Sequence, residues 1–210
     1  NQNQTVLYGI DSLLKVIGFS FPLIEKIGNI KPIRFFLKKL YSFISYNRKV
    51  IIPSKIKKEI KLQCIPNFNY KYRFLFIGFA TVITTIVLYN YSILITSLPK
   101  ANIVRELIIT LGQIIFQSLF ILKLDKKTIL NYSGNLMTIS LIGSLLLLPM
   151  LALQTVLNIS ENTILAWFAI TASIMFMEHY RRIKILELPT YLCLTWVFYR
   201  VIVLSLILNY

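Results

Sequence analysis

The sequence predicts a mainly α-helical membrane protein, in which a five-span transmembrane helical bundle follows a smaller N-terminal segment. The first observation is an uncharged run over residues 74–99, bracketed by Arg73 and Lys100. A run of about 20 apolar residues is long enough to cross a hydrocarbon core. The second is composition, since 56% of the 210 residues are hydrophobic and only 15% are charged. Such a chain is more apolar than a soluble domain of this length.

Four further apolar stretches follow the first, separated by short charged loops. The five predicted spans cover about residues 74–98, 102–122, 132–157, 163–180 and 189–208. Pro149 removes an amide donor inside the third span, so we expect a bend there. The chain thus divides into a cytoplasmic segment (1–53), a basic juxtamembrane linker (54–73) and a transmembrane domain (74–210).

Charge predicts how the bundle is oriented. The net charge is +15, and most basic residues lie before residue 74 or in the loops after the second and fourth spans. Because basic loops remain in the cytoplasm, we expect a cytoplasmic N-terminus and an external C-terminus in the cell inner (plasma) membrane. Basic residues interleaved with aromatic ones can bind RNA, but their position beside a span favours anionic lipid headgroups. We therefore expect membrane lipids, and no nucleic acid, as partners. Richness in Ile, Lys and Asn suggests a bacterial source.

The N-terminal segment begins with a predicted strand and a short helix. Residues 5–8 are β-prone and end at Gly9. Asp11 stands at the N-cap position of a helix over residues 12–17, and Gly18 is expected to end that helix.

A second helix is predicted to begin at Pro32, because proline suits the first turn. Apolar residues recur at helical spacing along it, while basic and serine residues take the other face. The apolar positions are Ile33, Phe36, Leu37, Leu40 and Ile44. Such a helix either packs on a small core or lies in the membrane interface with its lysines over anionic headgroups. The sequence leaves both interpretations open.

Over about residues 5–53 the chain resembles the C-terminal half of the DCC family. The residues that carry the resemblance are Asp11, Pro32, Tyr41, Asn47 and Arg48. Members of that family are small thioredoxin-like proteins regarded as thiol-disulfide oxidoreductases. The resemblance therefore implies that residues 1–53 are part of an α/β (thioredoxin-like) cytoplasmic domain.

The redox motif of that family is not in these 210 residues. The motif, Asp-x-x-Cys-x-x-Cys, supplies an attacking thiolate and its resolving partner. This chain has only Cys64 and Cys193, which are too far apart in sequence to form a CxxC pair, a disulfide framework or a zinc quartet. We therefore assign no catalytic residue, no cofactor and no metal site. Either the motif precedes Asn1, which is not an initiator methionine, or the chain has lost the chemistry.

Seven residues at the cytoplasmic boundary are expected to face lipid headgroups. They are Lys57, Lys58, Lys61 and Arg73 before the first span and His179, Arg181 and Arg182 at the inner end of the fourth. His179 is the only histidine, so bis-His ligation of haem within this chain is excluded. A general-acid or quinone-headgroup role for His179 has no supporting motif.

Four polar residues of the second span lie on one stripe. Glu106, Thr110, Gln113 and Gln117 recur at helical spacing. Such a stripe faces other helices or a wet cavity rather than lipid, because hydrogen bonds of about 0.6–2 kcal/mol are available there. The stripe therefore either joins helices by hydrogen bonds or forms a polar pathway or a ligand pocket.

The fourth and fifth spans each carry one further signal. A small-residue face on the fourth is typical of close helix packing and consists of Ala166, Ala169, Ala172 and Ser173. In the fifth, Arg200 lies near mid-membrane, where insertion of an unpaired arginine costs about 2.5–3.5 kcal/mol. Counted from the outer ends, Arg200 and Glu106 differ in depth by about 6 Å, which an arginine side chain can span, so we predict an ion pair between them. The alternatives are that Arg200 snorkels outward or meets a partner subunit.

Two functions from different classes follow. The packing faces, without a complete catalytic set, favour an accessory or scaffold subunit of a membrane protein complex, with other membrane proteins as partners. The alternative is a membrane-tethered thiol-disulfide oxidoreductase whose cysteines precede Asn1. A transporter comes third, because an odd number of spans without an internal repeat argues against inverted-repeat folds.

Overall fold

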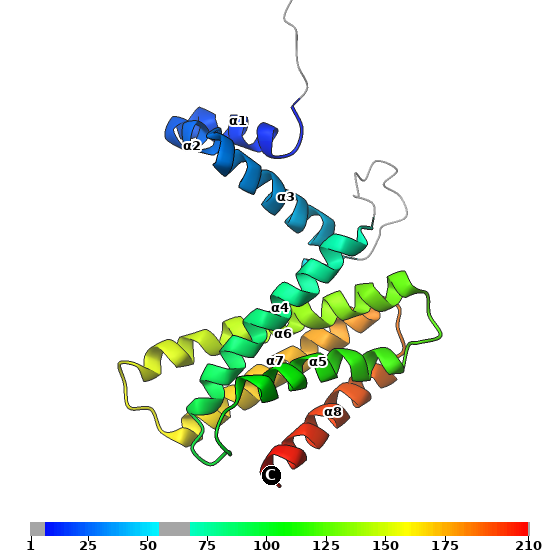
Figure 1. The fold of residues 1–210 in the computed structure, drawn as a ribbon. Helices are drawn as coiled ribbons and strands as arrows, with labels where there is room; N and C mark the ends of the chain where they lie inside the picture. The colour runs from blue at the N-terminus through cyan, green and yellow to red at the C-terminus, as the bar shows by residue number, and fades with distance from the viewer. Residues whose placement is uncertain (1–6, 55–67, 210) are drawn as a thin grey trace, which may run out of the picture.

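The computed structural model describes residues 7–54 and 68–209, and these two parts contain eight helices and no strand. Figure 1 shows their arrangement. In chain order the helices are α1 (Ile10–Ser20), α2 (Pro22–Gly28), α3 (Lys31–Ile51), α4 (Tyr70–Ile93), α5 (Ile103–Leu119), α6 (Lys126–Gln154), α7 (Glu161–Ile185) and α8 (Tyr191–Leu208).

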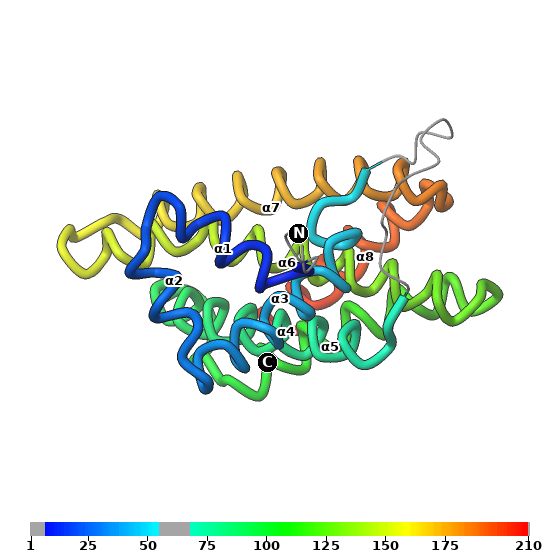
Figure 2. The backbone as a smooth tube through the Cα atoms, turned by 90° about the horizontal axis from the view of Figure 1, so that it is seen from above, coloured from blue at the N-terminus to red at the C-terminus, as the bar shows by residue number. Residues whose placement is uncertain are grey.

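Helices α4 to α8 form a bundle with α6 at its centre. Helix α6 packs against α4 on one side and α7 on the other (Figure 2). Helix α5 packs on α4 and α8, and α8 also contacts α7. Helix α3 contacts the bundle where α4 begins, and we call that end of the bundle the near end and the opposite one the far end.

Three helices of the bundle, α4, α6 and α8, are long and apolar enough to cross a membrane. Helix α5 has 17 residues, or about 25 Å at 1.5 Å per residue, which is slightly less than a hydrocarbon core. Helix α7 has 25 residues but carries charged residues at both ends. The mainly helical prediction is therefore confirmed, with three helices able to span. The structure does not by itself establish five spans.

Small residues let α6 approach its neighbours closely. At Gly143 a Cβ atom would lie only 2.3 Å from Sδ of Met175 on α7, so the Met175 side chain packs directly on the α6 backbone there. Hydroxyl groups of α6 donate to carbonyl groups one turn earlier, as Ser144 does to Ser140 at 2.9 Å. The third predicted span, including Pro149, is one continuous helix.

The apolar core of the bundle has two parts, one toward each end. The far-end cluster consists of Val87, Tyr91, Ile95, Leu147, Met150 and Ile164. The near-end cluster consists of Ile121, Tyr132, Ile183, Leu192 and Cys193. Buried polar side chains, among them Gln117, Ser140 and His179, also lie in the interior, which is unusual for helices of this apolarity.

The N-terminal part is helical throughout its described residues, which corrects two predictions. No strand forms at residues 7–8, and residues 5–6 lie outside the described range. Helix α1 begins at Ile10 and contains Gly18, so that glycine does not end it. Asp11 lies in the first turn rather than at the N-cap, because its carboxylate pairs with Arg34 of α3 at 2.9 Å. The expected α/β segment is therefore not present in residues 7–54.

Helix α2 was not predicted, because its seven residues are too short for a periodic signal. Helix α3 has Pro32 in its first turn, as the sequence predicts. Large apolar side chains, among them Phe19 and Phe36, remain exposed on α1 to α3.

Arg182 of α7 fastens the end of α3 to the near end of the bundle. Its guanidinium donates to the backbone oxygens of Val50 and Ile51, the latter at 3.1 Å, and to Oδ1 of Asn135 on α6 at 2.9 Å. The last carbonyl groups of a helix lack intrahelical donors and carry partial negative charge. Arg182 therefore caps α3 from outside, and α3 and α4 form a V that meets at this junction (Figure 1).

Candidate functional site

The polar stripe of α5 faces the interior of the bundle. Glu106, Thr110, Gln113 and Gln117 are all buried, as their helical spacing predicts. The hydroxyl of Thr110 donates to the backbone oxygen of Glu106 at 2.9 Å. The stripe thus brings three longer polar side chains into the space between α5 and its neighbours.

The predicted ion pair between Glu106 and Arg200 is wrong. Oε1 of Glu106 instead accepts from Nη2 of Arg105 at 2.7 Å and from Nε of Arg105 at 3.0 Å. Arg105 is adjacent in sequence and reaches the carboxylate directly. The guanidinium of Arg200 lies over the ring of Trp196, 5.1 Å from its centroid.

Gln117 is the centre of a network that joins four helices. Its Oε1 accepts from the hydroxyl of Tyr132 on α6 at 2.9 Å and from that of Thr195 on α8 at 3.2 Å. The Tyr132 oxygen lies 3.1 Å from Nε2 of His179 on α7. Because the Tyr132 proton is directed to Gln117, the histidine contact needs a proton on Nε2. Nδ1 of His179 is then the unprotonated nitrogen and can accept a hydrogen bond.

His179 is therefore not a headgroup anchor, because only 1% of its surface is exposed. Its ring packs against Trp196 of α8, with centroids 5.7 Å apart. The Arg200 guanidinium lies over the Trp196 ring. We call the whole set the polar cluster, and it consists of Gln113, Gln117, Tyr132, His179, Thr195, Trp196 and Arg200.

Several buried atoms of the polar cluster have no hydrogen-bond partner in the described parts of the chain. They are Nε2 and Oε1 of Gln113, Nε2 of Gln117, Nδ1 of His179 and Nε of Arg200. Leaving such atoms unpaired in an apolar interior is costly. The cluster therefore has more hydrogen-bonding capacity than its own side chains use.

Arg200 also lacks a carboxylate within residues 7–54 and 68–209. The acidic groups nearest in sequence to the spans are engaged elsewhere. Glu178 binds Arg181 and Arg182, both with separations of 2.6–2.7 Å. Glu161 accepts from Thr96 and from the Ser97 amide. Together with the Glu106–Arg105 pair, these contacts leave the mid-helix charge of Arg200 uncompensated.

The small-residue face of α7 is not covered by the described residues of this chain. Ala166, Ala169 and Ser173 are exposed, and Ala172 is half-buried. Helix α8 has its buried residues in its first two turns, where Trp196 meets Phe176 and His179. Arg200 is one turn beyond Trp196, so in the antiparallel helix it is level with Ala172.

The other residues predicted at the headgroups have different positions. Lys57, Lys58 and Lys61 lie outside the described residues. Arg181 is exposed. Arg73 and Arg182 are buried at the near end, so neither guanidinium lies on the open surface of the described residues.

The residues that carry the family resemblance have structural roles. Asp11 pairs with Arg34 and Lys38, and Nδ2 of the buried Asn47 donates to the backbone oxygen of Tyr72 at 3.0 Å. Pro32 starts α3. Tyr41 and Arg48 are exposed on α3.

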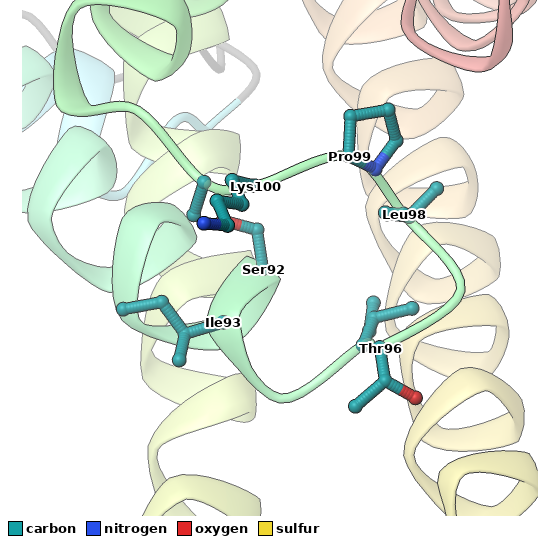
Figure 3. A pocket seen from close by; sticks show the side chains of 8 residues that line it. Ser92, Ile93, Thr96, Leu98, Pro99 and Lys100 are labelled. Atoms are coloured by element: carbon teal, nitrogen blue, oxygen red, sulfur yellow. The ribbon is translucent and has the colours of Figure 1, made fainter.

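An open pocket of about 420 Å³ lies at the far end, around the loop between α4 and α5 (Figure 3). Its lining is mainly aliphatic, with Ser92, Thr96 and Lys100 as the polar side chains. Since Thr96 already donates to Glu161, the pocket has few free polar groups, and we do not regard it as the functional site.

Sequence reasoning found the α5 stripe and Arg200 but missed Tyr132, Thr195 and Trp196. A signal existed for Trp196, because an aromatic residue four positions before an arginine on a helix places the ring beside the guanidinium. No group of three or more His, Cys, Asp or Glu suited to a metal occurs in the described residues.

No family model matches the chain, and no curated protein or solved structure is similar to it. The resemblance to the DCC family therefore stays a prediction.

Proposed function

We propose that the chain is an accessory or scaffold subunit of a membrane complex, and that it binds a helix of another membrane protein on the small-residue face of α7. The observation that carries this proposal is Arg200, a mid-helix charge without a carboxylate in the described residues. An Asp or Glu in a span of the partner would complete the pair.

Two features support a helix as the occupant of this surface. Small residues such as Ala169 let two helices approach closely in a bilayer, and this face is open over about two turns. An intramembrane arginine is stabilised when it meets an opposite charge inside a protein interface. Arg200 is level with Ala172, so one helix packed on this face can contact the small residues and also pair with Arg200.

The proposal includes five spans, with α5 and α7 crossing alongside α4, α6 and α8. In the bundle α5 and α7 pack along the three apolar helices, and buried residues line one side of each. Charged loops at the near end put the N-terminus in the cytoplasm and the C-terminus outside.

The topology is tested with single cysteines in a chain whose own Cys64 and Cys193 are serine. Cysteines that replace Lys126 and Lys184 should be shielded from an impermeant thiol reagent in intact cells. A cysteine that replaces Ser160 should be labelled. The opposite labelling pattern would overturn the orientation, and labelling of all three would overturn the span count.

Partner binding is tested by replacing Ala169 with p-benzoylphenylalanine and irradiating intact membranes. We expect one predominant adduct with another membrane protein. Arg200→Gln should lower its yield about tenfold, the factor for the 1.4 kcal/mol scale of one charged hydrogen bond. Replacing the carboxylate in the partner's span by its amide should do the same.

Two controls accompany this experiment. The first control places the same probe at Ile174. This position is about 160° around α7 from Phe176, the residue that contacts α8, so the probe there should capture lipid only. Arg105→Gln removes a charge that already has a partner and should leave the Ala169 adduct unchanged. An adduct of two copies of this chain, or a yield that does not depend on Arg200, would contradict the proposal.

A further inference from the structure

A second buried arginine lies at the near end, where α3 meets the bundle. Arg73, in the first turn of α4, is only 2% exposed. Its Nε and Nη1 atoms have no hydrogen-bond partner in the described residues. Its side chain crosses Gly134 of α6, where an added Cβ would be 3.0 Å from both Cδ and Nη1 of Arg73.

Few acceptors are near Arg73, and none of them is hydrogen-bonded to it. Both oxygens of Glu178 on α7 accept from Arg181, and one also accepts from Arg182. The oxygens of Val50 and Asn135 accept from Arg182. Asn47, which donates to the backbone oxygen of Tyr72, has an unpaired Oδ1. Arg73 and Arg182 both lie beside Val50, and the site has more positive than negative charge.

Phe68 connects Arg73 to a third cation. The Arg73 guanidinium is 5.4 Å from the centroid of the Phe68 ring, and Nζ of Lys127 is 5.8 Å from the same centroid. Lys127 is exposed and Phe68 is half-buried. The Phe68 ring is therefore shared by a buried cation, Arg73, and an exposed one, Lys127.

We propose that this junction binds a phosphate group, with Arg73 as its buried ligand and Lys127 at its entrance. The planar guanidinium donates in a fork that matches phosphate oxygens, while the lysine contributes a compact charge. The starts of α4 and α6 meet at this end of the bundle, which is the depth of lipid phosphates if these helices span. A phosphatidyl headgroup and a soluble phosphate share this chemistry, and experiment distinguishes them.

The test uses the full chain, delipidated in detergent and titrated with phosphatidic acid, with diacylglycerol and with inorganic phosphate. Binding is followed by native mass spectrometry and by the shift in melting temperature. We expect wild type to bind phosphatidic acid and not diacylglycerol. Lys127→Gln should weaken this binding about tenfold, and Arg73→Lys more strongly.

Lys126→Gln is the matched control, since it removes the same charge one residue away and should bind like wild type. If inorganic phosphate alone raises the melting temperature with the same dependence on Lys127, the ligand is a soluble phosphate. If only phosphatidic acid does, the ligand is a lipid.

Two results would overturn the phosphate site. The first is equal binding of phosphatidic acid by the Lys126→Gln and Lys127→Gln variants. The second concerns Glu59, which lies outside the described residues. A double-mutant cycle in which Glu59→Gln and Arg73→Gln are strongly coupled would show that Arg73 has an internal counter-ion.

Discussion

Two arginines of the bundle, one buried and one half-buried, have opposite surroundings. Arg182, at the near end, is 3% exposed and donates to Glu178, Asn135 and the backbone oxygens at the end of α3. Arg200, in the middle of α8, has a tryptophan ring beneath it and no carboxylate among the described residues. The first arginine completes an interface within the chain, whereas the second is the basis of the partner interface that we propose.

The largest effect should come from breaking the complete site. Arg182→Gln removes the cap of α3 and leaves Glu178 and Asn135 without their shared donor. We expect a loss of about 3–5 kcal/mol, as for removal of one member of a buried ion pair. The measurement is the free energy of unfolding in detergent. Arg181→Gln, at an exposed pair with the same carboxylate, should lose about 0–1 kcal/mol. Equal losses would refute the distinction.

The opposite sign is expected at Arg200. Arg200→Met keeps an unbranched apolar stem and removes an uncompensated charge, so the isolated chain should gain about 1–3 kcal/mol. The same unfolding measurement checks this prediction. A loss of stability would mean that Arg200 has an acceptor within the chain, and the comparison with Arg182 would fail.

A smaller effect is expected at the hydroxyl that joins α5, α6 and α7. Tyr132→Phe removes the donor to Gln117 and the partner of His179 Nε2, and should lower stability by about 1–3 kcal/mol. Tyr191→Phe loses an exposed hydrogen bond to the backbone oxygen of Phe120 and is the control. If the two variants have the same melting temperature, the network does not stabilise the bundle.

The smallest effect concerns Glu161 in the loop region at the far end. Hydrogen bonds from Ser97 and Thr96 lower the pKa of this carboxyl group to about 2, from an ordinary value of 4.5. A lowered pKa means that the contribution is present above pH 4.5 and is lost as pH falls toward 2. The melting temperatures of wild type and Glu161→Gln should therefore differ at pH 6 and converge as pH approaches 2. A constant difference would contradict this linkage.

The sequence predicted the helices of the bundle well because their apolar runs are long. Each of the five predicted stretches overlaps a helix, with bounds that differ by up to six residues; the best agreement is at α8, predicted over 189–208 and found at Tyr191–Leu208. Burial of the α5 stripe follows from the 3.6-residue period alone. The short N-terminal elements were harder, because residues 5–8 fit a strand or an irregular segment equally well and α2 has only two turns.

The contacts of the polar cluster could be predicted only in part. Comparing depths along two helices gives no information about their rotation or about nearer competitors. Glu106 therefore forms its ion pair with Arg105, one residue away, instead of Arg200. His179 was expected at a surface because its neighbours are charged, yet its ring points to Tyr132 and Trp196. Rotation of α7 decides this, and a single sequence does not contain it.

The contact between Arg182 and the end of α3 also sets an order of events during synthesis. The two partners are 132 residues apart in the chain, so α3 leaves the ribosome long before the side chain that caps it. Until α7 has been synthesised, the terminal carbonyl groups of α3 lack the Arg182 donor, and contacts of such long sequence separation form late. A nascent chain halted before Arg182 should therefore expose its N-terminal helices to proteases, and a chain halted after α7 should protect them.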